Sequence, residues 1–268
     1  MIKTIKIKES LGDCLIAGAC VQKLAELTGE KINLVTNMLL EPVFQYHPLI
    51  QLLDDAPIID VTLRWVSQLR KEKDINLYGL HTSQRFSHQL GFAIDPTYTL
   101  DIYGKNHKAI TPSGGRSKRV AINIFSAEAN RRFIPDYALK ILLETLDEYG
   151  YEIAFLGDCG QESSTRGISE SIEIITNSKL FIGPVSFQYH LASALKVKSL
   201  LFCSYMPYYK FSDFINTIAI YSDRGCVQFC EEFEKRTRKA EDCWGRCKAI
   251  EYNHNTIREK VLRCLGEK

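Results

Sequence analysis

Short apolar runs alternate with amphipathic stretches along this chain, and the alternation predicts strands and helices in turn. Ile2–Ile7 is a short β-branched run, and Ile32–Thr36 is a second one. Between them, Gly12–Leu27 places apolar residues such as Ile16 and Cys20 at helical spacing, with charged residues on the other face. A strand, a helix and a second strand in this order are typical of a doubly wound α/β fold.

The pattern is weaker between residues 39 and 59, where three prolines interrupt any long element. The apolar run Pro57–Val61 predicts another buried strand. Apolar residues on one side of His81–Gly91 predict a helix that closes the first half of the chain.

The second half of the chain gives a more regular alternation. The predicted strands are Val120–Phe125, Glu152–Leu156, Leu180–Ile182 and Ser199–Cys203. The predicted helices are Pro135–Tyr149, Ile168–Ile175, Phe187–Leu195 and Thr256–Leu265. Gly114 and Gly115 indicate a linker between the two alternating runs. We therefore expect an α/β chain of two Rossmann-like domains with parallel sheets, residues 1–112 and 113–268, and a ligand cleft between them.

The composition is that of an ordinary soluble globular protein, with 45% hydrophobic and 25% charged residues. A net charge of +2 is too small to imply a polyanionic partner. No apolar stretch reaches the ~18 residues of a membrane span, and lysines interrupt the amino-terminal run, so we expect a cytoplasmic protein without a transmembrane segment. Its nine cysteines should then be reduced, which leaves metal binding or burial to account for them.

An aspartate stands close after the first predicted strand. In Ser10-Leu11-Gly12-Asp13, Gly12 is expected to permit a sharp turn, and the Asp13 carboxylate then lies at the start of the first helix. A carboxylate at this place stabilises a helix as a cap. It also lies where open α/β sheets bind their ligands. Local chemistry leaves both roles open, a helix cap and a catalytic base.

The same segment carries a family resemblance. Lys8–Asp13, followed by an alanine-containing amphipathic helix, resembles the opening of glycosyltransferase family 9, the heptosyltransferases of lipopolysaccharide core synthesis. The resemblance implies a GT-B fold, a nucleotide-diphosphate sugar as donor, and Asp13 as the base that deprotonates the acceptor hydroxyl. It places Gly12 among the donor-binding residues.

A second resemblance covers Phe181–Leu195, which is similar to the strand, turn and His-Leu-Ala helix that receive the sugar-nucleotide diphosphate in this family. It implies donor binding by Gly183, Ser186 and His190. Backbone donors at the start of a helix suit a phosphate. A core histidine is the alternative for His190. The sequence departs from the family pattern at two positions, since Val185 replaces an acidic or small polar residue and Phe187 replaces glycine.

A third resemblance covers Asn123–Pro135, which is similar to the basic-aromatic-proline stretch of the family. It implies that Ser126 and one of Arg131 and Arg132 bind the diphosphate. A guanidinium group suits phosphate because it donates two parallel hydrogen bonds. A solvated surface arginine is the alternative.

Four cysteines form two equal pairs within residues 226–247. Cys226 and Cys230, and Cys243 and Cys247, each enclose three residues, and twelve residues separate the pairs. Four thiolates can close a tetrahedral site, so the pattern predicts structural zinc or iron, with free thiols as the alternative. The branch of the family that glycosylates bacterial autotransporter proteins has a similar set of four cysteines, which holds iron.

These features predict an inverting glycosyltransferase that moves a sugar to a hydroxyl of a glycan, a lipopolysaccharide core or a protein. A homo-oligomer is compatible with this prediction. One alternative is a glycosyltransferase that modifies a hydroxymethylated base of phage DNA, with the basic stretch Lys105–Arg119 contacting the phosphates. The other is a non-catalytic module that is stabilised by a metal ion and binds a sugar or a protein. In that case, Val185 and Phe187 indicate that the donor pocket has lost its function.

Overall fold

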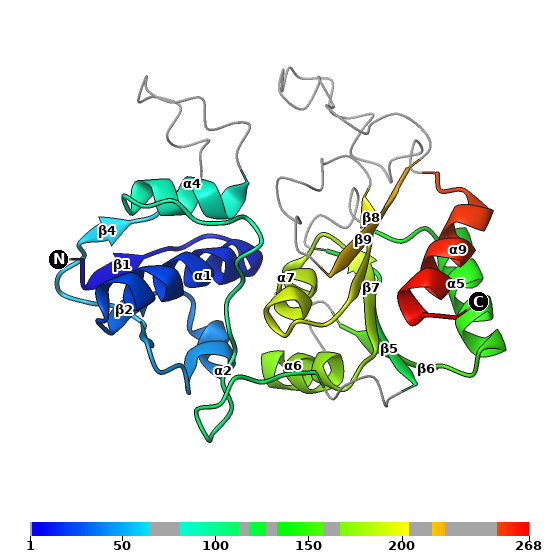
Figure 1. Ribbon diagram of the computed structural model, residues 1–268, viewed down its shortest axis with the longest axis horizontal. Coiled ribbons are helices and arrows are strands. Elements are labelled where there is room, and N and C mark those ends of the chain that lie inside the picture. Colours follow the sequence, from blue (N-terminus) through cyan, green and yellow to red (C-terminus); the bar gives the residue numbers. More distant parts are fainter. Residues whose placement is uncertain are drawn as a thin grey trace, which may run out of the picture. The chain divides into compact units, whose positions relative to one another are not determined.

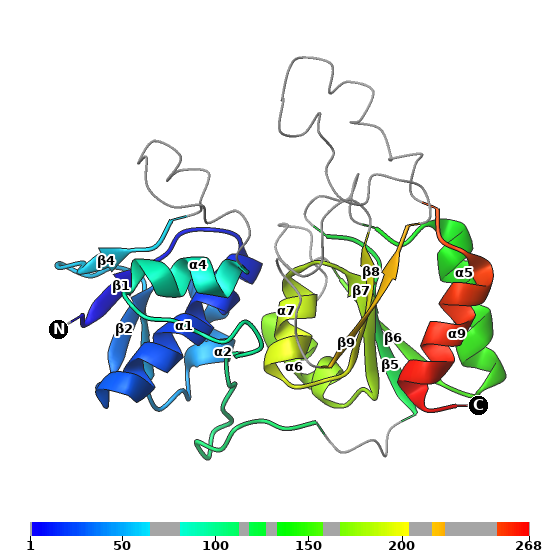
Figure 2. The ribbon, with the colours of Figure 1, turned by 45° about the horizontal axis from the view of Figure 1, so that its top comes forward.

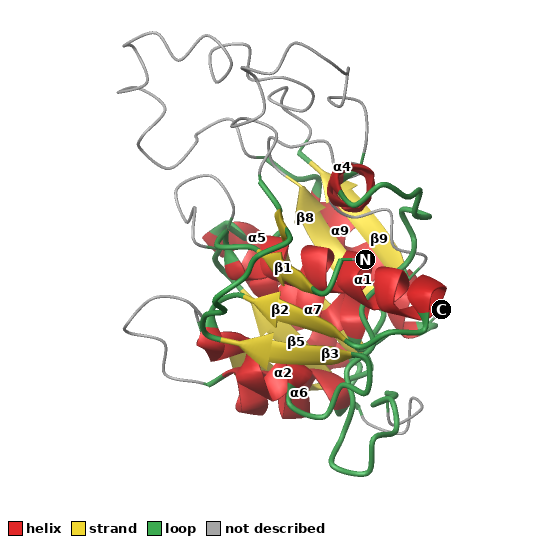
Figure 3. Ribbon diagram, turned by 90° about the vertical axis from the view of Figure 1, so that its left-hand side faces the viewer, coloured by secondary structure: helices red, strands yellow, loops and turns green. Residues whose placement is uncertain are grey.

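The computed structural model describes residues 2–64, 81–112, 118–126, 133–157, 167–203, 216–222 and 251–267. The described residues form two compact units that divide between Thr111 and Pro112. Each unit is built on one parallel sheet with helices packed against it (Figures 1 and 3).

The first unit contains a four-stranded sheet in the order β3-β2-β1-β4, with all neighbouring strands parallel. Its strands are β1 (Thr4–Lys6), β2 (Ile32–Val35), β3 (Ile50–Leu53) and β4 (Val61–Thr62). Its helices are α1 (Leu11–Thr28), the 3₁₀ helix η1 (Met38–Leu40), α2 (Glu41–Phe44) and α4 (Thr82–Gln89). Helix α1 packs against α4, where the Cys20 thiol donates to the carbonyl of Ser83 at 3.3 Å.

The second unit contains a five-stranded parallel sheet in the order β6-β5-β7-β8-β9. Its strands are β5 (Arg119–Asn123), β6 (Glu152–Leu156), β7 (Leu180–Pro184), β8 (Ser199–Cys203) and β9 (Thr217–Tyr221). Its helices are α5 (Asp136–Glu148), α6 (Ile168–Thr176), α7 (Phe187–Ala194) and α9 (His254–Leu265). Helices α5 and α9 cover one face of the sheet, and α6 and α7 cover the other (Figure 2).

The apolar core of the second unit lies between the sheet and the α5–α9 pair. Val120 and Ile122 of β5, Leu142 of α5 and Val261 of α9 are all 0% exposed and belong to one cluster. Fully burying a side chain of this size contributes about 1.5–3 kcal/mol. Burial on both faces explains why the central strands β5, β7 and β8 are apolar along nearly their whole length.

The helix boundaries follow local capping chemistry. Ser10 caps α1, because its Oγ accepts the N–H of Asp13, and Gly29 ends the helix with a φ of 70°. Gly150, with a φ of 67°, follows α5, as its position in the sequence predicts. Among the described helices, none combines the length and apolar character that crossing a membrane requires.

The predicted α/β fold with two parallel sheets is confirmed, but three strand assignments need correction. The run Pro57–Val61 was expected to be a buried strand, whereas β4 begins only at Val61 and Ile58 is 72% exposed. Strands β3 and β9 were not predicted. Both are short strands at sheet edges and each has only one buried residue, which gives a weak apolar pattern.

The ends of strand β9 and helix α9 are joined by a reciprocal pair of hydrogen bonds. The Ser222 hydroxyl donates to the carbonyl of Glu251 at 3.1 Å, and the N–H of Glu251 donates to the Ser222 hydroxyl at 3.0 Å. Residues 223–250 lie between these two positions in the sequence and outside the described residues.

A buried polar network centred on Gln22 holds α1 against two loops of the first unit. The Nε2 group of Gln22 donates to Tyr98 Oη at 2.8 Å and to Asp101 Oδ2 at 2.9 Å. Its Oε1 atom accepts from the N–H of Asp101 at 2.9 Å and contacts His47 Nε2 at 3.1 Å. Gln22 is 1% exposed and His47 is 4% exposed, so these bonds replace water for groups that would otherwise be buried unpaired.

His47 makes the stability of the first unit dependent on pH. Its Nδ1 atom accepts the N–H groups of Leu49 and Ile50 at 3.2 and 3.1 Å, so the ring is neutral with its proton on Nε2. Burial lowers the pKa of His47 from 6.5 to about 4. As the pH falls, the unfolded chain therefore takes up a proton before the folded chain does. We expect the free energy of unfolding to decline between pH 6.5 and about 4, by up to about 3 kcal/mol from this group.

Urea unfolding at a series of pH values measures this slope. His47→Asn should flatten the decline between pH 6.5 and 4 relative to the parent chain, even though it lowers the stability at neutral pH. His88, which is exposed on α4, provides the matched control as His88→Asn. Equal slopes in the parent chain and in His47→Asn would contradict the assignment.

Candidate active site

Each sheet reverses its strand order next to its first strand. In the first unit the chain runs from β1 to β2 and β3 on one side and then to β4 on the other side of β1. In the second unit β6 lies on one side of β5, and β7, β8 and β9 lie on the other. Loops leave such a switch point in opposite directions, and open α/β sheets bind ligands there, beyond the carboxyl ends of the strands.

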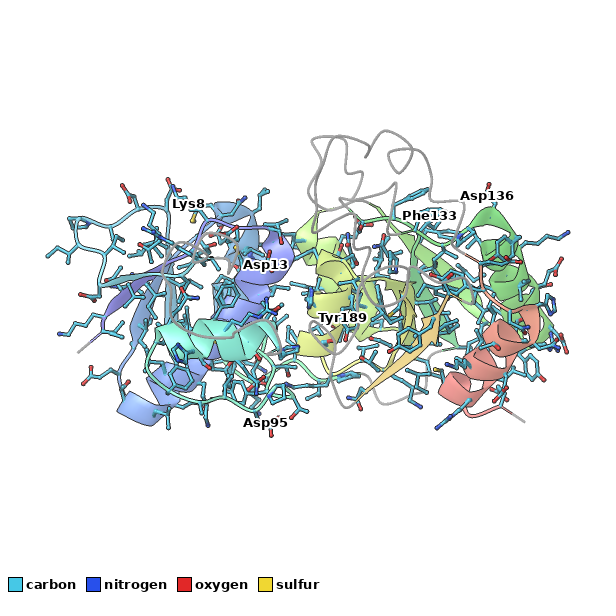
Figure 4. The ribbon with its side chains drawn as sticks, turned by 90° about the horizontal axis from the view of Figure 1, so that it is seen from above. Lys8, Asp13, Asp95, Phe133, Asp136 and Tyr189 are labelled. Carbon is cyan, nitrogen blue, oxygen red and sulfur yellow. The ribbon has the colours of Figure 1, made fainter. Side chains whose placement is uncertain are left out.

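Asp13 lies in the first turn of α1, the helix that follows β1 (Figure 4). Its carboxylate accepts the hydroxyl hydrogen of Ser10 at 2.7 Å. The N-cap is Ser10 rather than Asp13, so the expected capping role belongs to the serine. The sharp turn expected at Gly12 is wrong, because α1 already begins at Leu11 and the φ of Gly12 is not positive.

The Asp13 carboxylate lies beside a hydrogen-bond donor at the start of a helix. A helix amino terminus carries a positive partial charge, and the Ser10 hydroxyl donates to the carboxylate oxygen. The neighbouring Cys14 is buried, and burial raises the pKa of its thiol, so this cysteine is held in the neutral form. Of these two neighbouring side chains, the carboxylate is the type that commonly serves as a general base.

The switch point of the second unit carries a buried polar network. Asn123 ends β5, and its Nδ2 group donates to the carbonyl of Phe125 at 2.6 Å and to the Ser186 hydroxyl at 3.1 Å. Gln188 Nε2 donates to the carbonyl of Gly157, just after β6, at 2.9 Å. Asn123, Ser186 and Gln188 are 1%, 7% and 2% exposed. The network thus ties together the carboxyl ends of three neighbouring strands.

The start of α7 presents hydrogen-bond donors at this place. Ser186 caps the helix, and its Oγ accepts the N–H of Tyr189, which Figure 4 labels, at 3.3 Å. Among the described residues, nothing accepts a hydrogen bond from the N–H of Phe187 or Gln188. Val185 and Phe187 are only 6% and 8% exposed, so their apolar side chains are packed away from solvent. Such a helix start can bind an anion.

Close packing leaves no room for a side chain at Gly183. It lies within β7, and a Cβ atom there would stand 2.9 Å from Phe181 Cζ and 3.1 Å from the carbonyl oxygen of Asn123. Phe181 is fully buried and the Asn123 carbonyl belongs to the backbone, so neither moves easily.

We expect Gly183→Ala to lower the free energy of unfolding by about 1–3 kcal/mol, because β5 and β7 must separate to admit a methyl group. Chemical denaturation measures the change. Gly104→Ala is the matched control, since a Cβ atom there meets nothing closer than 3.6 Å. Equal stability of the two variants would show that the close approach of β5 and β7 is not a constraint.

Solved structures that are similar to this chain share one fold. No protein-family model matches the sequence, and no curated protein matches it. The structure of the dodecameric iron-containing heptosyltransferase TibC from enterotoxigenic E. coli, in complex with ADP-D-beta-D-heptose, aligns with a TM-score of 0.72 and 14% identity, over 100% of this chain and 79% of TibC. The E. coli ADP-heptose lipopolysaccharide heptosyltransferase II aligns with a TM-score of 0.68 and 10% identity, over 98% of each chain.

A glycosyl transferase family 9 protein from Veillonella parvula aligns with a TM-score of 0.62 and 12% identity, over 99% of this chain and 98% of that protein. This chain has the GT-B fold. The predicted likeness in fold to glycosyltransferase family 9 is thereby confirmed. At these identities, the comparisons support the fold, and the chemistry has to be argued from the residues.

Within the GT-B fold, the predicted site residues fall into three groups. Asp13 follows the first strand of one sheet, and Ser126 and Ser186 follow adjacent strands of the other. His190 lies one turn inside α7, is 7% exposed and packs edge-on against Tyr189 at 5.2 Å between ring centroids. The predictions that lie outside the described residues concern Arg131, Arg132, Cys226, Cys230, Cys243 and Cys247. The described residues contain no cluster of side chains suited to a metal ion.

Sequence reasoning missed Asn123 and Gln188. Asn123 ends the apolar run Val120–Ile122, and a polar residue at the carboxyl end of a buried strand was the available signal. Gln188 lies in a helix that is buried along its whole length, where a polar side chain needs a hydrogen-bonding partner.

Proposed function

We propose that this chain is a glycosyltransferase that moves a sugar from a nucleoside-diphosphate sugar to an acceptor hydroxyl. The observation that carries the proposal is the set of donors at the switch point of the second sheet. The Ser186 hydroxyl and the N–H groups of Phe187 and Gln188 start a helix in a GT-B fold, and such donors suit a diphosphate.

We propose that the two units bind different substrates. Residues 1–112 bind the acceptor and carry Asp13, and residues 113–268 bind the donor. The acceptor oxygen attacks the anomeric carbon from the face opposite the diphosphate, and the bond from that carbon to the diphosphate oxygen breaks, so the configuration inverts. Asp13 takes the proton of the acceptor hydroxyl. The negative charge on the departing nucleoside diphosphate is stabilised by Ser186, the start of α7 and one of Arg131 and Arg132.

The donor and acceptor are proposed only by class. TibC was solved with ADP-D-beta-D-heptose and an E. coli heptosyltransferase with ADP, so ADP and ADP-heptose are the first ligands to test on this chain. A glycan, a lipopolysaccharide core and a protein are the acceptor classes that we propose to test.

A thermal-shift screen of nucleoside diphosphates and nucleotide sugars tests donor binding directly. A ligand at 100 times its dissociation constant stabilises the native state by about 2.7 kcal/mol, which is easily measured. We expect at least one nucleoside diphosphate to raise the melting temperature, and its sugar conjugate to do the same. A chain that responds to none of them is better described as a non-catalytic binding module.

We also propose that Cys226, Cys230, Cys243 and Cys247 hold a structural iron or zinc ion. Two pairs of thiolates supply the four ligands of a tetrahedral site. Cys226→Ser combined with Cys243→Ser should reduce the bound metal from about one ion per chain to nearly none, as measured by mass spectrometry of the purified protein. Cys264→Ala, at a buried cysteine in α9, is the control and should keep its metal. Purified parent chain that lacks stoichiometric metal would refute the proposal.

A further inference from the structure

We propose that Asn123 is a positioning residue, whose amide fixes the Ser186 hydroxyl as a hydrogen-bond donor toward the donor diphosphate. This inference rests on the proposed function and adds a residue to it. The juxtaposition joins the last residue of β5 to the residue that precedes α7, 63 positions away in the sequence.

The orientation of the Asn123 amide is determined by its surroundings. The carbonyl of Phe125 lies 2.6 Å from Nδ2 and can only accept a hydrogen bond, so the nitrogen must face it. The second N–H of the same group is then directed to Ser186 Oγ at 3.1 Å, with Gln188 Oε1 beside it at 3.4 Å. Asn123 is 1% exposed, which keeps water from competing for these bonds.

The hydroxyl of Ser186 therefore has only one bonding capacity left. A serine hydroxyl has two lone pairs and one hydrogen. One lone pair accepts the N–H of Tyr189 at 3.3 Å, and the other accepts Asn123 Nδ2. The hydroxyl hydrogen has no acceptor among the described residues. A ligand atom that meets this hydroxyl must accept a hydrogen bond, as a phosphate oxygen does.

The neighbouring contacts make this arrangement rigid. Gln188 Nε2 donates to the Gly157 carbonyl at 2.9 Å, so the glutamine oxygen that faces Asn123 is held from the β6 side. The network spans the ends of β5, β6 and β7, where a shift of one strand would break a bond. Asn123 thereby orients the hydroxyl before the ligand arrives, which favours binding because less orientational freedom is lost.

Asn123→Asp tests the inference with a side chain of the same size. Burial favours the neutral carboxyl group, whose single hydrogen is taken by the Phe125 carbonyl. The same oxygen can then only accept from Ser186, so the Ser186 hydroxyl turns inward to donate to it. We expect the dissociation constants of inorganic pyrophosphate and of ADP, measured by calorimetry, to rise by about 10- to 100-fold. Adenosine, which has no phosphate, should bind the parent chain and the variant equally.

Ser186→Ala and the double variant separate positioning from a merely structural role. If Asn123 acts through Ser186, removal of the hydroxyl should weaken pyrophosphate binding in the parent chain and change it little in Asn123→Asp. Thr145→Val is the control for lost stability, since Thr145 is a buried hydroxyl of α5 that donates to the carbonyl of Ile141. It should leave pyrophosphate binding unchanged.

Two outcomes overturn the role of Asn123 and leave the proposed function intact. In the first, the effects of Asn123→Asp and Ser186→Ala on pyrophosphate binding are additive. In the second, Asn123→Asp binds pyrophosphate as tightly as the parent chain. Absence of ADP and pyrophosphate binding in the parent chain overturns both. If Asn123→Asp does not fold, Asn123→Ser provides the second variant, because its shorter hydroxyl still suits the Phe125 carbonyl. It should weaken pyrophosphate binding in the same way.

Discussion

Asp13→Asn is expected to reduce the rate of sugar transfer by about 10²- to 10⁴-fold, the usual contribution of a positioned general base. The asparagine keeps the size of the side chain and an oxygen that can accept the Ser10 hydroxyl, but its amide takes up no proton at neutral pH. The affinity for nucleoside diphosphate should stay unchanged, because Asp13 acts on the acceptor. Turnover with saturating donor and acceptor, together with donor binding by calorimetry, measures the two effects.

The matched control is Asp95→Asn, at an exposed aspartate of the same unit whose carboxylate accepts from the backbone and hydroxyl of Thr97. It should retain full turnover. Because Asp13 also lies at a helix amino terminus, its replacement should cost only about 0.3–1 kcal/mol of stability, which leaves the fold intact. Turnover of Asp13→Asn within about threefold of the parent chain would exclude the proposed base.

Gln22→Met is expected to lower the stability of the first unit strongly. The variant keeps the length of the side chain but leaves the Nε2 group of His47 and the N–H of Asp101 without their acceptor. Each buried donor that loses its partner costs about 1–3 kcal/mol, so the sum is about 2–6 kcal/mol. Total stabilities of domains are about 5–15 kcal/mol, and a loss of this size should populate the unfolded state visibly.

Circular dichroism during thermal unfolding measures this loss. Gln51→Met, at an exposed glutamine of β3, makes the same chemical change without breaking a buried network. It should melt within a few degrees of the parent chain. A Gln22→Met variant as stable as Gln51→Met would mean that the network contributes nothing net to the fold.

The sequence predicts the repeating βα units well, because both faces of each buried strand and one face of each helix are apolar. Residues 120–122, 180–182 and 199–203 are nearly free of polar side chains, and they form central strands. The prediction of a strand at Pro57–Val61 was wrong for a physical reason. The apolar residues that follow Pro57 form an exposed connection, with Ile58 at 72% exposure. Local pattern alone does not distinguish such a run from a short strand.

The candidate site was predictable where it depends on local order. Asp13 and Ser186 stand at helix starts that come soon after a strand, which a single sequence reveals. Asn123 was missed because its importance arises from a contact 63 residues away. The packing constraint at Gly183 was also missed, because it comes from the carbonyl of Asn123 across the sheet. Long-range contacts between strands cannot be predicted from a local sequence motif.

The hydrogen-bonded pair of Ser222 and Glu251 has a consequence for how this chain can be altered. These two bonds hold residues 222 and 251 beside each other, so the end of β9 and the approach to α9 are fixed relative to one another. Closing a longer or shorter loop changes its entropy only slowly with length. We therefore expect a change in the number of residues between Ser222 and Glu251 to cost little stability, because the two ends of that segment stay bonded to each other.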